Sequence, residues 1–247
     1  MPPPDPVAAL VRWFWIPEWR IAPGRTSRQH LIAFPVCNLV VERDGVGFVG
    51  PPTRASYRDL SGTGWAVGAL LQPAAVPFFA ADPGTLRDGY QPVPAADLHA
   101  AVTAAMTGPG DGPSRHDRAV RAFAEWLHRT LPAPGPDALL ANAMADLIGA
   151  DPAVLTVEDV AARLHVSVRT LQRLARRYVG LPPLAMIRRR RLQEAAERVR
   201  AEPETSLAAL AADLGYADHA HLANEFRSVL GFTPSGYRRQ VHRPGPG

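Results

Sequence analysis

Side chains that can hydrogen-bond to nucleic-acid bases recur at helical spacing between residues 168 and 178. An arginine can donate two hydrogen bonds to guanine, and a glutamine amide can pair with adenine. Arginines further along such a helix suit phosphate groups better. The pattern predicts a DNA-contacting face with base readers on its first two turns and phosphate binders after them. The predicted base readers are Arg169, Thr170, Gln172 and Arg173, and the predicted phosphate binders are Arg176 and Arg177.

A second and poorer set lies about fifty residues further along the chain. His219, Ala223, Asn224 and Arg227 occupy the equivalent face of another predicted helix. Asn224 can read adenine, but the set has fewer long donors than the first. We therefore expect the first set to carry more of the sequence specificity and the second more of the positioning. Ordinary solvated helix faces are the competing interpretation, which two sets in register make less credible.

The helices that carry these two sets of residues belong to a sequence unit that occurs twice in the chain. The first copy runs from Leu155 to Leu164 and closes with Gly180-Leu181-Pro182-Pro183. The second runs from Ser206 to Leu214 and closes with Gly231-Phe232-Thr233-Pro234. Each copy is predicted to form a helix, a tight turn and a second helix, the arrangement that presents one helix to a DNA major groove. Matching apolar positions are Val160-Ala161 with Leu210-Ala211, Leu164 with Leu214, and Leu171 with Leu222.

Capping and turn residues support both copies. Thr156 is a good N-cap, and Asp159 three residues later comes close to a capping box. Asp218 is the expected cap of the second copy's outer helix. Gly215 fits a turn that needs a positive φ. His165 stands at the equivalent turn of the first copy, where glycine would fit more easily, although histidine tolerates this conformation better than a β-branched residue does.

A long helix over Leu184–Arg200 is predicted to join the two copies. At about 1.5 Å per residue it spans roughly 25 Å. It contains Arg188-Arg189-Arg190-Arg191, and on a helix these side chains spread around the axis. Two of them can pair with Glu194 and Glu197 within the helix. Contact of one or two with DNA and a fully solvated, internally paired helix both stay open.

Composition separates the two parts of the chain. From Asp151 onward there are 15 arginines and 10 acidic residues, and before it 12 arginines and 13 acidic residues. The basic C-terminal part is therefore the one expected to meet a polyanion. The chain contains no lysine, so the placement of arginine is more informative than its abundance. No apolar stretch suits a membrane span, and the N-terminus lacks a secretory signal, so a cytoplasmic location is expected.

The N-terminal part is predicted to be rich in β-strands. Short apolar runs such as Leu31–Phe34, Asn38–Val41 and Trp65–Leu71 alternate with turn signals, which favours an antiparallel arrangement. Helices are predicted over 96–106, 114–131 and 136–149. We place a domain boundary near residue 150, giving domains 1–150 and 151–247. The fold class is α+β: a β-rich, sensor-like domain with following helices, then an all-α domain of two helix-turn-helix units joined by a long linker helix.

The C-terminal part resembles the AraC/XylS family of bacterial transcription regulators over Thr156–Gln240. The most specific match is Leu207–Tyr216, followed by Leu222–Arg227 and Gly231–Arg238. The resemblance implies two helix-turn-helix units held by a linking helix, with both recognition helices in successive major grooves of double-stranded DNA. The chain departs from the family where Ala175 replaces a frequent phenylalanine and Asn224 a frequent basic residue. The second departure puts the operator sequence beyond prediction.

The N-terminal part resembles the sensor domains attached to many such regulators, which bind a small effector, dimerise, or do both. Trp13, Trp15 and Trp65 are candidates for lining an apolar effector pocket, as is Trp19. Ordinary core packing is the competing interpretation for each of them. Two functions stay open: a regulator controlled by a small-molecule effector, and a ligand-independent regulator with an interaction or dimerisation module. RNA polymerase and a second copy of the chain are candidate partners of both.

Residues with catalytic or metal-binding chemistry show no informative spacing. His30, Cys37, Asp44 and Asp59 lie in the β-rich part, but they match no catalytic or metal motif. We therefore predict a protein that is not an enzyme, with no catalytic residues, no metal site and no cofactor. Cys37, the single cysteine, is expected to be a buried small hydrophobe.

Overall fold

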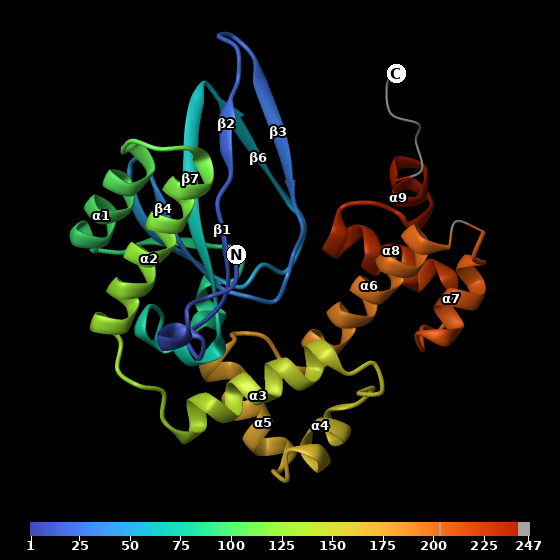
Figure 1. Cartoon of the computed structure of the whole chain (residues 1–247). Coiled ribbons are helices and arrows are strands. Elements are labelled where there is room, and N and C mark those ends of the chain that lie inside the picture. The colour runs from blue at the N-terminus through green and yellow to red at the C-terminus, as the bar shows by residue number, and fades with distance from the viewer. Residues whose placement is uncertain (203, 242–247) are drawn as a thin grey trace.

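The computed structural model describes residues 1–202 and 204–241, and only the backbone of residues 240 and 241. Residues 242–247, at the end of the second predicted domain, lie outside the described residues. A β-rich N-terminal part carries two helices on one side, and a string of helices follows below and beside it (Figure 1). The predicted α+β class is confirmed, with a strand-rich first part and a helical second part.

The main sheet is antiparallel at each of its described pairs. Its strand order is β1-β7-β4-β5-β8, and β2 extends the pairing along β7. The β4–β5 hairpin turns at Arg43-Asp44-Gly45, as the turn signal predicts, and Gly45 has a positive φ of 149°. The strands are β1 (Val11–Trp15), β2 (Glu18–Arg20), β4 (Asn38–Glu42), β5 (Gly45–Val49), β7 (Thr63–Leu71) and β8 (Tyr90–Pro92).

Two further strands form a separate ribbon. β3 (Thr26–Leu31) pairs antiparallel with β6 (Ser56–Ser61), from Thr26 opposite Ser61 to Leu31 opposite Ser56. The predicted strand over Leu31–Phe34 was wrong, because β3 ends at Leu31 and the chain then bends tightly. The Phe34 amide donates to the Ile32 carbonyl at 3.0 Å, and the Val36 amide donates to the Phe34 carbonyl at 2.8 Å. Pro35 between them has no amide hydrogen for a ladder.

Helices α1 (Ala96–Thr107) and α2 (Gly112–Thr130) pack together against the sheet. The Gly108–Pro113 segment separates them, and the Asp111 carboxylate caps α2 by accepting from the Ser114 amide at 3.0 Å. Their apolar faces meet the sheet in the first hydrophobic core, where Phe14 and Phe123 lie edge to face at 5.5 Å. The predicted helices over 96–106 and 114–131 are thus confirmed to within two residues.

Helix α3 (Pro136–Ala150) shares a second core with the first helix-turn-helix unit, α4 (Val157–Arg163) and α5 (Val168–Tyr178). Ala141, Met144 and Ile148 of α3 are buried in that core. The buried Asn142 joins α3 to the N-terminal part: its amide donates to the Ala9 carbonyl at 2.8 Å, and its carbonyl accepts from the Ala74 amide at 2.9 Å. Ala74 lies in the 3₁₀ segment η2 (Pro73–Phe78). The boundary near 150 stays a prediction, and α3 contacts both sides of it.

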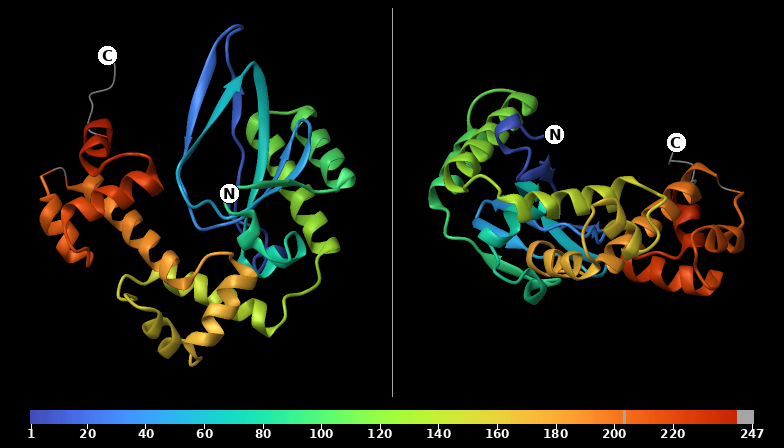
Figure 2. Two further views of the ribbon diagram at one scale, coloured as in Figure 1. Left: turned by 180° about the vertical axis from the view of Figure 1, so that it is seen from behind. Right: turned by 90° about the horizontal axis from the view of Figure 1, so that it is seen from below.

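The long helix α6 (Pro183–Ala201) leads from the second core to a third. This third core joins the end of α6 to α7 (Leu207–Asp213), α8 (His219–Leu230) and α9 (Pro234–Val241), with Phe226 fully buried. Views from behind and from below show that α6 bridges the two helical units and that α7–α9 lie at the opposite end of the molecule from α1 and α2 (Figure 2). The predicted linker helix is confirmed.

Candidate nucleic-acid interface and effector cavity

The first helix-turn-helix unit has the local geometry that its sequence predicts. The Thr156 hydroxyl accepts from the Asp159 amide at 3.1 Å, and the Asp159 carboxylate accepts from the Thr156 amide at 2.8 Å, which completes the capping box. The Ser167 hydroxyl caps α5 through the Thr170 amide at 3.1 Å. His165 forms the turn with a positive φ of 55°. A side chain therefore occupies a conformation that favours glycine.

The second unit repeats this geometry with a glycine at the turn. Gly215 has a φ of 71°, Ser206 caps α7, and the Asp218 carboxylate accepts from the His221 amide at 2.7 Å. The small residues predicted at the helix contacts, Ala161 and Ala211, are both buried. Both units therefore bring their second helix, α5 or α8, into the position of a recognition helix.

The six residues predicted to contact DNA from α5 lie on the side of the helix away from its core. Leu171, Leu174 and Ala175 are buried, whereas five of the six predicted residues are exposed and Thr170 is half-buried. The Thr170 hydroxyl lies 2.9 Å from the Ser167 hydroxyl, so it is already hydrogen-bonded within the cap. The exposed five are Arg169, Gln172, Arg173, Arg176 and Arg177.

Two carboxylates that the sequence analysis did not single out lie against this face. Asp137, at the start of α3, accepts from Arg173 at 2.7 and 3.4 Å. These hydrogen bonds hold the pKa of the Asp137 carboxyl below its usual range. Asp82 lies 3.9 Å from Arg176. Spacing along the chain carries no sign of either contact, because Asp137 and Asp82 reach α5 only through the packing of α3 and of the loop after η2.

The face of α8 is exposed but offers fewer donors. His219, Asn224 and Arg227 are exposed, and Ala223 is half-buried beside the buried Leu222. This distribution matches the expected helical face. The inequality between the two copies that their sequences predict is therefore also present in space: α5 presents four exposed arginines, and α8 presents one.

The arginine run of α6 is largely structural. Arg189 is only 6% exposed and donates to the Pro52 carbonyl, and Arg190 is 7% exposed and donates to the Val154 carbonyl at 2.9 Å. Arg191 donates to the Leu155 carbonyl at 2.8 Å. The expected pair with Glu194 forms, from Arg190 at 2.9 Å, whereas Glu197 pairs with Arg200 instead. Arg188 is the member of the run that lies exposed.

A cavity of about 570 Å³ lies between the main sheet and the β3–β6 ribbon. Its walls are mainly apolar, with an ion pair between Arg58 and Glu42 at 2.6 Å at one side. The size and the mixture of apolar walls with a few polar groups are typical of small-molecule sites. Lining residues from the sheet include Trp15, Asn38, Val40 and Ala66, and those from the ribbon and its ends include Gln29, His30, Leu31, Ile32, Ser56 and Leu60.

The structure places the predicted tryptophans differently from one another. Trp15 lines this cavity, and its indole nitrogen donates to the Asn38 side chain at 3.0 Å. Trp19 also lines the cavity. Trp65 packs against the first core instead, and Trp13 is 47% exposed. The structure therefore brings two of the four candidate tryptophans, Trp15 and Trp19, to the cavity, whereas the ribbon that closes the cavity was not predicted.

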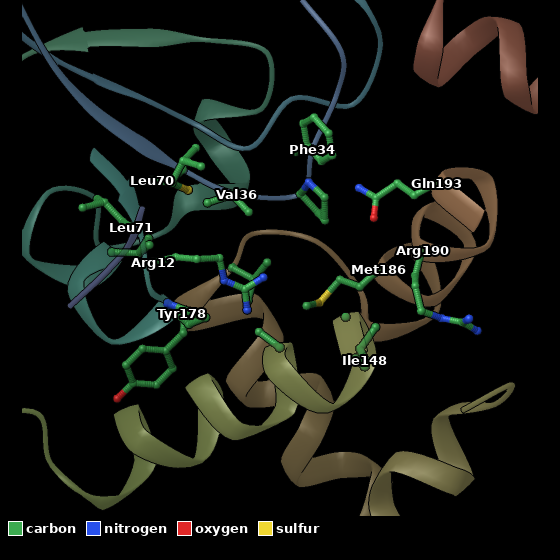
Figure 3. Close-up of a pocket in the computed structure, with 17 residues that line it drawn as sticks. Arg12, Phe34, Val36, Leu70, Leu71, Ile148, Tyr178, Met186, Arg190 and Gln193 are labelled. Atoms are coloured by element: carbon green, nitrogen blue, oxygen red, sulfur yellow. The ribbon is translucent and has the colours of Figure 1, made fainter. Parts of the chain in front are cut away.

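A smaller cavity of about 250 Å³ lies where the N-terminal part meets α3 and α6. Figure 3 shows Phe34, Val36 and Leu70 on one side of it, Ile148 and Met186 on the other, and the Arg12 guanidinium reaching in between. Phe34, Val36 and Leu70 also line the larger cavity. The two cavities therefore share a wall.

Other kinds of site find little support in the part of the chain that the structure describes. There, no three His, Cys, Asp or Glu side chains gather to hold a metal ion, and no helix is long and apolar enough to cross a membrane. Cys37 is 2% exposed, and burial raises the pKa of its thiol to about 12. It is the buried small side chain that the sequence predicts.

Two capped helix-turn-helix units joined by one helix define a class of DNA-binding protein. Comparison with known families agrees: residues 160–240 match a family model described as a helix-turn-helix domain, and residues 1–92 match a domain of unknown function, DUF6597. An AraC-like transcription regulator of Streptomyces lividans is 35% identical over 129 residues, which are 52% of this chain and 40% of that protein. The helix-turn-helix part of the chain is therefore similar to the DNA-binding part of AraC-like transcription regulators.

Two further comparisons cover a shorter segment of the chain and nearly all of it. The regulatory protein PocR of Salmonella typhimurium is 30% identical over 88 residues, which are 36% of this chain and 29% of PocR. The matches to both curated relatives thus span less than half of those proteins. The crystal structure of ToxT from Vibrio cholerae O395 aligns with 94% of this chain and 99% of its own, at 12% identity and a TM-score of 0.45.

Proposed function

We propose that this chain binds a specific duplex DNA site through α5 and α8 and thereby regulates transcription of nearby genes. The observation that carries the proposal is the pair of exposed recognition-helix faces joined by α6, with their apolar sides in separate cores. Arg169, Gln172 and Arg173 are the proposed base readers, with Thr170 beside them, and Arg176 and Arg177 are the proposed phosphate contacts. His219, Ala223, Asn224 and Arg227 are the proposed contacts of the second unit.

The test is selection of genomic binding sites with the full chain, followed by footprinting. Arg173→Ala should lose about 1–3 kcal/mol of binding free energy and relax base preference in one half of the site. Arg176→Ala, one turn away on the same helix, should weaken binding to all sequences alike and reduce the dependence on salt. Absence of any protected site with the full chain would contradict the proposal.

We further propose that a small, mainly apolar effector binds in the cavity between the sheet and the β3–β6 ribbon. In this division of labour residues 1–150 regulate and residues 151–247 bind DNA, with α3 contacting both. Thermal-shift screening of a metabolite library should find a compound that stabilises the chain. Leu60→Arg, which places a charge inside the cavity, should abolish that shift. Ser61→Arg, a neighbour on the same strand that does not line the cavity, should keep it.

A ligand-independent regulator is the second candidate function. Trp13 favours it, because its side chain is 47% exposed on β1, which stands at one end of the strand order of the main sheet, and a strand at the edge of a sheet can pair with another chain. RNA polymerase and a second copy of the chain are the proposed partners. If no compound stabilises the chain and sedimentation shows a dimer that Trp13→Ser disrupts, this second function replaces the first.

A further inference from the structure

The last turn of α8 is capped by the N-terminal part of the chain. The final carbonyls of a helix have no partner within the helix and need one elsewhere. The Ser228 carbonyl accepts from the Ala55 amide at 3.0 Å, and the Val229 carbonyl accepts from the Ala33 amide at 3.2 Å. Ala33 follows β3, and Ala55 precedes β6. The base of the ribbon thus completes the hydrogen bonding of the second recognition helix.

An aromatic contact lies beside these hydrogen bonds. The rings of His30 and Phe232 meet edge to face, with their centres 4.5 Å apart. Gly231 permits the approach: a Cβ atom on it would lie 2.1 Å from the His30 Nε2 and 3.1 Å from the Ala55 Cβ. Gly231 also ends α8 with a φ of 81°. One glycine therefore serves both the end of the helix and its contact with the ribbon.

These contacts join the second helix-turn-helix unit directly to the N-terminal part, in addition to its covalent connection through α6. The first helix-turn-helix unit is joined to the N-terminal part through α3 and η2, whereas the second has its own core. His219, Asn224 and Arg227 of α8 stay exposed in this arrangement. Since a recognition helix contacts bases mainly with its N-terminal residues, holding its C-terminal end leaves the DNA-contacting face free.

We propose that the backbone contacts of Ala33 and Ala55 with α8, together with the His30–Phe232 contact, form a latch that preorganises α8 relative to α5 for two-groove binding. The inference rests on the proposed DNA-binding function. A rigid presentation of two contact surfaces lowers the entropy lost on binding. Closing the latch should therefore raise affinity for a duplex that contains both half-sites, which are the successive major-groove segments contacted by α5 and α8. It should leave affinity for a duplex with the α5 half-site alone unchanged.

The latch is also a wall of the larger cavity. His30, Leu31, Ile32 and Phe34 line the cavity on either side of Ala33, and Ser56 does so beside Ala55. Since the backbone of this short segment bonds to α8 while its side chains line the cavity, a molecule in the cavity meets the same segment that holds α8. The latch thus gives the cavity a direct physical route to the second recognition helix.

The first test opens the latch from the side of the ribbon. His30→Ala removes the ring that meets Phe232 and changes none of the side chains of the third core. It should weaken binding to a two-groove duplex by about five- to tenfold, the lower part of the range for coupled sites, without changing binding to the α5 half-site. Arg28→Ala, two residues earlier on the same face of β3, is the matched control and should bind as the wild type does.

The second test closes the latch covalently in the His30→Ala background. The Ala55→Cys/Ser228→Cys pair replaces two residues whose backbones are hydrogen-bonded, with 3.0 Å between the Ala55 amide nitrogen and the Ser228 carbonyl oxygen. Mass spectrometry of the oxidised protein establishes that the disulfide has formed before DNA binding is measured. Cys37 is buried and should not compete for the new thiols. Oxidation should restore two-groove affinity, and in a redox buffer the duplex should shift the thiol–disulfide equilibrium toward the cross-linked form, because the coupling is reciprocal.

The outcomes separate the latch from the function on which it rests. Weaker DNA binding once the disulfide has formed, or wild-type affinity for the two-groove duplex in His30→Ala, would each overturn the latch. If neither the wild type nor any variant protects a duplex, the DNA-binding function itself fails.

Discussion

Replacing Phe226 with alanine should unfold the second helix-turn-helix unit while leaving the rest of the chain folded. The Phe226 side chain is fully buried in the third core, and its ring centre lies 5.8 Å from that of Tyr237. Removal of a buried phenylalanine costs about 3–5 kcal/mol, which shifts a folding equilibrium by roughly 10²- to 10⁴-fold. Among the described residues, nine form the buried part of this core. Because a core of this size stabilises the unit by only a few kcal/mol, the loss of one large side chain is enough to unfold it.

The chain offers a direct way to see such partial unfolding. All five tryptophans precede residue 127, so their fluorescence reports on the N-terminal part, whereas far-UV circular dichroism reports on all helices. In Phe226→Ala, some helical signal should be lost at a lower temperature than the tryptophan transition. Phe78→Ala makes the same change at a side chain that is 45% exposed, and it should shift neither signal by much.

Footprinting gives the functional counterpart of this experiment. Phe226→Ala should lose protection over the half-site of α8 and keep protection over the half-site of α5. The reasoning is refuted if the fluorescence and dichroism transitions move together, because the three cores would then unfold as one unit. It is refuted equally if both half-sites are lost while the first two cores stay folded.

Three further results are expected. Asp137→Asn frees Arg173 from an ion pair whose side chains are about half exposed. Since an exposed ion pair of this kind is weak, gel-shift affinity for DNA should rise by no more than about fivefold; a fall would show that Asp137 positions Arg173. Asn142→Leu leaves the buried Ala74 amide and the part-buried Ala9 carbonyl without this partner. It should lower the free energy of unfolding by about 1–3 kcal/mol through the amide, with a smaller loss through the carbonyl, measured by denaturant titration; an unchanged midpoint would show that Asn142 does not hold α3 to the N-terminal part. Burial lowers the pKa of His30, so the folded state favours the neutral ring. The contribution of the neutral ring to the free energy of unfolding should be complete above about pH 6.5, the ordinary pKa of histidine, and should be lost as the pH falls through the lowered pKa of the folded state. Thermal unfolding of the wild type and of His30→Ala over this pH range tests whether the difference in stability shrinks on acidification.

The repeated helical units were predictable because their information is local. Thr156, Asp159, Asp218 and Gly215 act on residues within a turn or two of themselves, so the sequence alone defines the caps and the turns. The inequality of the two faces followed from residue types at helical spacing. The unfavourable turn of the first unit was also predictable, since His165 occupies the place where the second unit has a glycine, and it takes a positive φ.

The ribbon and its cavity were not predictable from the same kind of pattern. β6 reads Ser-Tyr-Arg-Asp-Leu-Ser, and five of its six residues are exposed, so it lacks the apolar alternation that marks a strand packed on a core. The contacts of Asp137 and Asp82 with α5 also depend on tertiary packing. Trp15 and Trp65 both lie in the part of the chain predicted to be rich in β-strands, yet one lines the cavity and the other packs on the core.

The shared core around α3 bears on how regulators of this kind exchange parts in evolution and in the laboratory. A chimera joined at residue 150 would separate Ala141, Met144 and Ile148 from the α4 and α5 side chains that they cover. A junction in the proline-rich segment 132–136 would carry those residues along with the DNA-binding helices, but would still need partners for Asn142 on the incoming domain. The transferable cassette therefore begins at Pro136, and a compatible receptor is one that offers an amide and a carbonyl where Ala74 and Ala9 now stand.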